Sequence, residues 1–230
     1  MKVVRLGLAL IVALGFLVTS SLANAAGGGG GGGGDYRGGS GGSAQRSSRS
    51  PERVAKRSYQ AGLRHKEKAW KLEEKAAKEE DAEDRDALLA KARNSYEKAI
   101  GAQSAALKAV PTHYEAANEL GYALRKTGQY EKAIASYNRA LELNAVYFPA
   151  VEYRAEAYLA TGQLEKAKTS YMTLFRNDRK LADQLMRAMD EWVEKQPAGD
   201  ETKSFAEWVK ERQALANVGD DLSQNNSRRW

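Results

Sequence analysis

The sequence predicts an all-α protein built from repeated helical hairpins, and three observations support this. Ala, Glu, Lys and Leu, which favour helices, dominate residues 51–195, and no alternating strand pattern occurs there. A shift of 34 residues places YEKAI at 96–100 on YEKAI at 130–134, and TGQ at 127–129 on TGQ at 161–163. The breaks between helical segments fall at residues that cap helices. The repeat makes each hairpin an architectural unit.

The expected helices follow from these breaks. Ser50 can cap the first one, and Pro51 suits the first helical position, where an N–H would be unpaired anyway. The expected ranges are 51–79, 85–109, 113–126, 131–143, 149–160, 164–176, 179–195 and 201–215. The polar end from Asp220 to Trp230 is expected to be disordered.

Residues 1–25 have the pattern of a bacterial secretory signal peptide. Lys2 and Arg5 precede an uncharged apolar run at 6–18, and small residues at 23–25 predict cleavage after Ala25. The alternative is an uncleaved anchor, but the apolar run is shorter than the ~20 residues that a membrane span needs. We therefore expect a periplasmic or secreted protein without a stable membrane span. With no cysteine, it forms no disulfide there.

A glycine-rich segment separates this signal from the first helix. Glycine gains no burial and loses much conformational freedom on ordering, so residues 26–50 are expected to form a flexible linker. Residues 46–68 are rich in Arg and Lys, which is typical either of a contact with an anionic partner or of a solvated helix face. The formal net charge of +6 is modest for 230 residues and does not imply a nucleic-acid partner.

The best-defined hairpin has one apolar stripe on each helix. The stripes contain Ala117, Leu120, Gly121 and Leu124 on the first helix, and Ala133, Tyr137, Ala140 and Leu141 on the second. Gly121 and Ala133 are small where the two helices are expected to approach closely. Gly128 supplies the left-handed turn, and Thr112 with Glu115 fits a capping box. One hairpin cannot bury both stripes, so neighbours are required.

These residues resemble the tetratricopeptide repeat (TPR), a helix-turn-helix unit of 34 residues. The resemblance rests on Leu120, Gly121, Gly128, Tyr130, Ala133, Tyr137 and Ala140. It is best for 114–147 and 148–181, and a degenerate unit with an insertion covers 51–113. It implies a TPR-like domain at 51–195 with about three repeats, in which 179–195 caps the last one. Residues 196–230 would add a helix and a tail. Arg154, at the slot of Leu120, is expected to snorkel or to pair with Glu156 or Glu119.

In this family the first helices of successive hairpins line a concave groove that binds a peptide or a helix. The resemblance therefore implies a protein-binding groove with Tyr122 as an aromatic anchor. The residues that it assigns are Glu115, Asn118, Tyr122, Arg125, Lys126, Glu152, Glu156 and Leu159. The family's groove for a terminal carboxylate is not expected, because Tyr122 and Glu152 replace the polar and basic residues that it uses.

Catalysis has little support in the sequence. His65 and His113 are far apart, and no helical pair of His and carboxylate resembles a zinc site, so we expect no catalytic residues, cofactor or metal. We expect a scaffold for protein–protein interaction. The alternatives are an accessory factor that binds a cell-envelope polymer or an envelope enzyme through its basic segment, and an enzyme.

Overall fold

The computed structural model describes residues 50–197 and 199–227 of the chain. The chain divides into two units, residues 1–49 and residues 50–230, and only the second is described. The expected signal peptide and the glycine-rich segment up to residue 49 therefore lie outside the described residues, as does the terminal Trp230.

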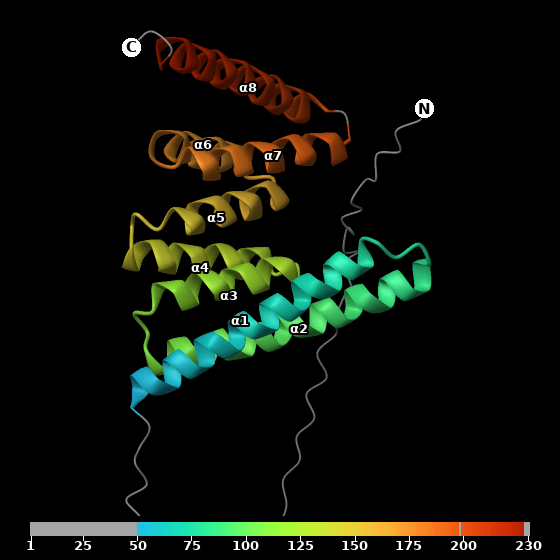
Figure 1. Cartoon of the computed structure of the whole chain (residues 1–230), viewed down its shortest axis with the longest axis vertical. Coiled ribbons are helices and arrows are strands. Elements are labelled where there is room, and N and C mark those ends of the chain that lie inside the picture. The colour runs from blue at the N-terminus through green and yellow to red at the C-terminus, as the bar shows by residue number, and fades with distance from the viewer. Residues whose placement is uncertain (1–49, 198, 228–230) are drawn as a thin grey trace, which may run out of the picture. The chain divides into compact units, whose positions relative to one another are not determined.

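The described ranges form eight α-helices and contain no strand, which confirms the all-α prediction (Figure 1). The helices are α1 (Pro51–Ala76), α2 (Ala82–Ala109), α3 (Tyr114–Lys126), α4 (Tyr130–Leu143), α5 (Phe148–Ala160), α6 (Leu164–Asn177), α7 (Arg179–Lys195) and α8 (Asp200–Ser227). Ser50 caps α1 as expected, because its side chain accepts a hydrogen bond from the backbone N–H of Arg53 at 3.4 Å.

Sequential helices pack as hairpins, and the hairpins stack on one another (Figure 1). Each odd-numbered helix also contacts the next odd-numbered one, so that α1, α3, α5 and α7 form a continuous row. This arrangement is a helical solenoid in which each repeat packs on its neighbours. The row is the place where the groove was predicted.

The α1–α2 hairpin is longer than the others and is held by small residues. Its buried positions on α1 are Ala55, Gly62, Ala69 and Ala76, which recur every seven residues. A Cβ at Gly62 would lie only 2.3 Å from Nε2 of Gln103, so α2 approaches α1 closely at this point. Gln103, Tyr137 and Tyr171 are spaced by 34 residues, and the insertion therefore lies at the far end of this hairpin.

The two TGQ turns have the same structure. Gly128 and Gly162 have φ of 81° and 71°, which an L side chain rarely adopts. The N–H of Gln129 donates to the carbonyl of Leu124 at 2.9 Å, and the N–H of Gln163 donates to that of Tyr158 at 2.8 Å. These are the bonds of a Schellman motif, and they confirm the turn predicted at Gly128.

Side chains of the repeated signature complete these turns. Nε2 of Gln129 donates to the Thr127 hydroxyl at 3.1 Å, and Nζ of Lys132 donates to the side-chain oxygen Oε1 of Gln129 at 2.9 Å. The same chain of contacts joins Gln163 to Thr161 at 2.8 Å and Lys166 to Gln163 at 2.7 Å. The repeated threonine, glutamine and lysine are thus explained as a lock on the turn.

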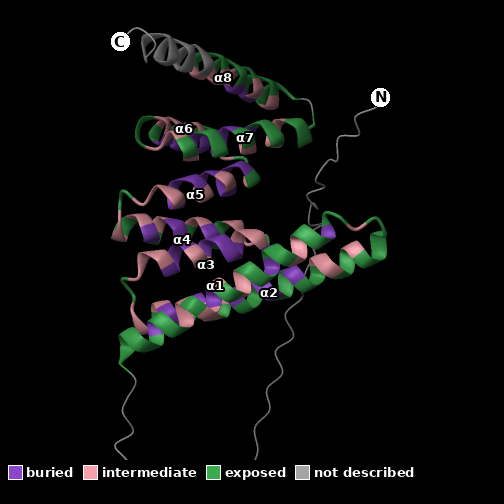
Figure 2. Cartoon of the chain, viewed as in Figure 1, coloured by how far each residue is buried: buried purple, intermediate pink, exposed green. Residues whose placement is uncertain are grey.

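Alanine and tyrosine fill the core between the hairpins (Figure 2). Ala117, Ala133 and Ala140 are fully buried, and the ring of Tyr137 lies over Gly121. A Cβ at Gly121 would lie 2.6 Å from Cε1 of Tyr137, which confirms the close approach predicted there. Another core cluster extends from α5 and α6 through α7 into α8, where Phe205 and Val209 are buried.

Three local predictions are corrected. The last helix runs to Ser227, so the prediction of disorder from Asp220 is wrong for residues 220–227. The cap of α3 is His113, whose Nδ1 accepts from the N–H of Ala116 at 3.4 Å, and the Thr112–Glu115 capping box does not form. Arg154 donates to Oδ1 of Asn138 at 2.7 Å and pairs with neither predicted glutamate, because Glu119 pairs with Lys66 and Glu156 with Arg125.

Candidate functional site

The predicted groove residues come from two adjacent helices. Helix α3 carries Glu115, Asn118, Tyr122, Arg125 and Lys126, and α5 carries Glu152, Glu156 and Leu159. The two helices are in contact, so the structure brings the two sets together. Four of the eight are buried, namely Asn118, Tyr122, Glu152 and Leu159. The other four are partly exposed, and they are the ones that a partner can reach directly.

Tyr122 lies inside a group of aromatic rings. Its hydroxyl accepts a hydrogen bond from Nε1 of Trp70 at 2.7 Å, and its ring centroid is 5.9 Å from that of Trp70 and 5.2 Å from that of Tyr153. Tyr122 is only 8% exposed, whereas Trp70 is 43% exposed. Tyr122, which the sequence predicted as the aromatic anchor, is therefore mostly buried, and the exposed ring beside it is that of Trp70. Trp70 was missed because the repeat pattern does not specify the register of α1 against α3.

Arg125 joins the two helices of the site. Its guanidinium forms an ion pair with Glu156 and lies 5.3 Å from the ring centroid of Tyr122 and 5.7 Å from that of Tyr153. Both charged side chains are mostly shielded from solvent, so the pair is stronger than one on an open surface. Arg125 therefore holds α5 against α3, and Glu156 keeps a quarter of its side chain exposed.

Glu152 is a buried carboxyl group next to this ion pair. Burial, the nearby carboxylate of Glu156 and a hydrogen bond to it raise the pKa of Glu152 to about 9, and Arg125 offsets only part of this. The raised pKa favours the protonated form of Glu152 near neutral pH, and in that form the carboxyl group can donate a hydrogen bond. The site thus combines a buried carboxyl group with an ion pair between a guanidinium and a carboxylate.

Ion pairs also fasten α1 to α3. Lys66 pairs with Glu119, and Nζ of Lys126 lies 2.8 Å from Oε1 of Glu73. The other oxygen of Glu73 accepts from the hydroxyl of Tyr96 on α2 at 2.9 Å. Lys126 is therefore engaged within the molecule, and α1 forms part of the wall of the site.

Glu115 forms no ion pair with another helix among the described residues. Its carboxylate lies 3.0 Å from Nδ1 of its neighbour His113, and a third of its side chain is exposed. The ring of His113 packs on Tyr59 of α1 with centroids 4.8 Å apart, so this histidine is half-buried and structural. Asn118 is 1% exposed, and its Oδ1 accepts no hydrogen bond from the described residues.

The described part of the chain offers no group of three or more His, Cys, Asp and Glu arranged to hold a metal ion. The predictions of no cofactor and no catalytic residue stay predictions. Among the helices that the structure describes, none is both long enough and apolar enough to cross a membrane.

Two matches to family models agree with the repeats seen in the structure. Residues 114–145 and 154–181 each match a model of the tetratricopeptide repeat. The fold is thus an all-α solenoid of helical hairpins, and residues 114–145 and 154–181 are the part of the chain that is similar to tetratricopeptide repeats.

No curated protein matches the chain in sequence. Among solved structures, it is similar to the first TPR of Spaghetti (RPAP3) bound to the HSP90 peptide SRMEEVD. The identity is 22%, the match covers 69% of this chain and 95% of that one, and the TM-score is 0.37. A similarity of this size supports no conclusion about the ligand of this chain.

Proposed function

We propose that this protein is a scaffold that binds a segment of another protein in the groove lined by α3 and α5. The observation that carries the proposal is the pair of consecutive tetratricopeptide repeats whose first helices lie in contact. Residues of the turns and of the helix contacts recur between the two repeats. Residues on the groove side differ between the two repeats: Asn118 is replaced by Glu152 at the equivalent position, and Tyr122 by Glu156.

The contacts of these residues narrow how the groove would bind. Because Arg125, Lys126 and Tyr122 are held by internal partners, the groove is rigid before the partner arrives. A rigid surface loses little conformational entropy on binding. The groups offered to the partner would be Glu115, the exposed part of Glu156, and the ring of Trp70 at the α1 side.

We also propose that the protein is exported, with residues 1–25 as its signal peptide. This rests on the sequence alone. N-terminal sequencing of the mature protein from the envelope fraction tests it. A new N-terminus at Ala26 is the expected result, and a retained Met1 in a cytoplasmic fraction would contradict it.

Site-specific photo-crosslinking in the native host tests the groove. A photoreactive amino acid at Glu115, on the groove side of α3, is expected to capture a discrete protein partner. The matched control places it at Glu131, an exposed acid on α4, the second helix of the same hairpin. Capture of the same partner with equal yield from both positions would refute the groove assignment, as would capture from Glu131 alone.

A further inference from the structure

A second surface of the molecule lies on α1, away from the groove. Six basic residues form one stripe along this helix: Arg53, Arg57, Arg64, Lys68, Lys71 and Lys75. At 100° per residue they fall within an arc of about 60°, and at 1.5 Å per residue they extend over about 33 Å. All six are exposed, and Figure 2 shows exposed positions recurring along α1. We call them the basic stripe.

The basic stripe faces away from the helices against which α1 packs. The residues on the opposite side are Ala55, Gly62 and Ala69, which pack on α2. Lys66 and Glu73, which pair with α3, also lie on that opposite side. Since α1 packs on α2 and α3 and all six basic residues are exposed, the stripe is open to a partner.

Most charges of the stripe have no counter-charge. Lys71 pairs with Glu67 of the same helix at 2.6 Å. The other five form no ion pair with the described residues. Two acids of the same helix, Glu73 and Glu74, pair instead with Lys126 and Lys78. The field reaches a neighbouring histidine. Burial lowers the pKa of His65, and Lys98 of α2, Arg64 and Lys68 lower it further.

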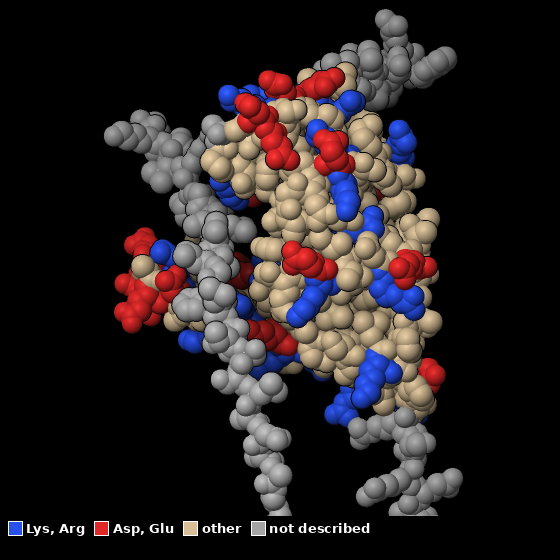
Figure 3. Space-filling model, turned by 180° about the vertical axis from the view of Figure 1, so that it is seen from behind, with Lys and Arg blue, Asp and Glu red and all other residues tan. Residues whose placement is uncertain are grey.

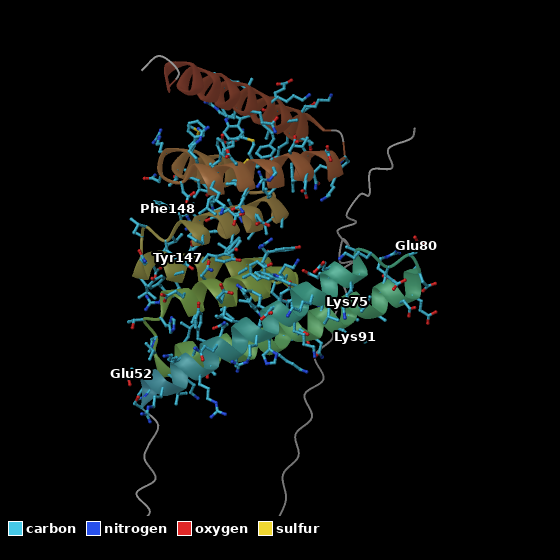
Figure 4. The ribbon with its side chains drawn as sticks, in the orientation of Figure 1. Glu52, Lys75, Glu80, Lys91, Tyr147 and Phe148 are labelled. Carbon is cyan, nitrogen blue, oxygen red and sulfur yellow. The ribbon has the colours of Figure 1, made fainter. Side chains whose placement is uncertain are left out.

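The charge reverses at the tip of the same hairpin. The exposed acids of this tip are Glu80, Asp81, Glu83, Asp84 and Asp86. Figure 3 shows a cluster of acidic side chains at one edge of the molecule, and Figure 4 labels Glu80 at the tip of the hairpin. A ligand that is uniformly negative over a wide area, such as an anionic bilayer or a nucleic acid duplex, would meet repulsion at this tip. A polypeptide can place negative charge over the stripe alone.

The spacing of the stripe also fits a polypeptide. Arg53 and Arg57, Arg64 and Lys68, and Lys71 and Lys75 are each four residues apart, which is about 6 Å along the helix. Side chains on one face of an extended peptide recur every ~6.6 Å. Acidic residues at alternate positions of such a peptide would therefore match the two cations within each of these pairs.

We propose that the basic stripe of α1 is a docking surface for an acidic, extended segment of a partner protein. Binding there is electrostatic, because the stripe itself consists of exposed cations, while the small residues of the opposite side of α1 are buried. The surface is separate from the α3–α5 groove, so an experiment can disprove one of the two proposed binding sites without affecting the other.

The test uses the full chain and a fluorescent synthetic peptide of alternating Glu and Ser, followed by fluorescence anisotropy. The stripe variant carries Arg57→Gln, Arg64→Gln and Lys68→Gln. The control carries Arg176→Gln, Arg187→Gln and Lys180→Gln, which remove the same charge from exposed positions of α6 and α7. Circular dichroism melts verify that both variants fold.

The stripe variant is expected to bind the peptide about tenfold more weakly than wild type, since each exposed ion pair contributes modestly. The control is expected to stay within about twofold, and added salt is expected to weaken binding by wild type. A peptide of alternating Gln and Ser should not bind. In NMR titrations, the acidic peptide is expected to raise the pKa of His65, because it offsets Arg64, Lys68 and Lys98.

Two results would overturn the proposal. One is equal affinity of the stripe variant and the control for the acidic peptide. The other is tighter binding, at equal total charge, to phosphatidylserine-containing vesicles or to polyphosphate than to the acidic peptide.

Discussion

The α3–α4 and α5–α6 hairpins are built on the same plan and differ in what they place on the groove side. Both close with the same Schellman turn at Gly128 and Gly162. In the first, Tyr137 of the second helix packs over Gly121 of the first helix, and at the equivalent positions of the other hairpin Tyr171 and Ala155 belong to one core cluster. The scaffold is therefore repeated.

The groove-side positions differ between the same two hairpins. Asn118, Tyr122 and Arg125 of α3 are replaced by Glu152, Glu156 and Leu159 at the equivalent positions of α5. The two sets are complementary, because Arg125 of one pairs with Glu156 of the other. A repeat can thus keep its packing while its groove acquires a chemistry of its own.

Replacement of the small residue distinguishes the two hairpins most strongly. Gly121→Ala is expected to lower the free energy of unfolding by about 1–3 kcal/mol, because the new Cβ would lie 2.6 Å from the ring of Tyr137 in a packed core. The equivalent position already holds Ala155, which is fully buried. Thermal or urea unfolding measures the change. Unaltered stability of Gly121→Ala would show that the first hairpin does not depend on this close approach.

Replacement of the buried carboxyl group of Glu152 is expected to stabilise the protein, in contrast to the replacement of Gly121. The pKa of Glu152 is raised in the folded state, so as pH rises from about 4.5 toward about 9 the unfolded chain releases this proton first and the protein loses stability. Each pKa unit between the folded and unfolded states corresponds to about 1.4 kcal/mol of stability. Glu152→Gln is therefore expected to raise the free energy of unfolding at pH 8 by at least about 1.4 kcal/mol. At pH 4 the gain should vanish. A gain of equal size at both pH values would contradict the assignment.

The turns provide the matched comparison, in which the hairpins should respond alike. Gly128→Ala and Gly162→Ala are each expected to cost about 1 kcal/mol, because both glycines have positive φ and no neighbouring atoms that a Cβ would meet. Unfolding in urea measures both. A loss at one position only would mean that the two turns are not equivalent.

The smallest effect concerns the side-chain lock. Gln129→Ala and Gln163→Ala each remove a hydrogen bond to a threonine and one from a lysine. Because the lysine bonds are exposed, each variant is expected to lose only about 0.5–1 kcal/mol. Melting curves of the two variants should coincide in their shift. A shift much larger at Gln163 would show that the lock matters more where α8 begins to cover the solenoid.

The helices and turns could be predicted because they depend on local signals. The 34-residue spacing, the positive-φ glycines and the alanine stripes all lie within one or two hairpins. Gly121 could be assigned to a helix contact for the same reason. The length of α8 could not, because its polar end resembles a disordered segment in composition although the helix reaches Ser227.

The environment of the groove residues depends on contacts that the sequence pattern does not specify. Trp70 and Tyr122 are 52 residues apart, and the insertion in the first hairpin hides the register of α1. The ion pair between Lys126 and Glu73 could not be predicted for the same reason. The predicted positions were therefore on the expected helices, but which of them are buried or paired followed only from the packing of α1 and α5 on α3.

The most direct test of the scaffold model compares the two faces of one hairpin. Once photo-crosslinking has identified a partner, its affinity is measured for wild type, for Glu115→Lys on the groove side of α3 and for Glu131→Lys on α4. Both changes reverse one solvent-accessible acid, so the change in net charge is matched. We expect Glu115→Lys to change the affinity about fivefold or more and Glu131→Lys to change it less than about twofold. Equal effects of the two variants, or a larger effect of Glu131→Lys, would contradict a binding site in the groove of α3 and α5.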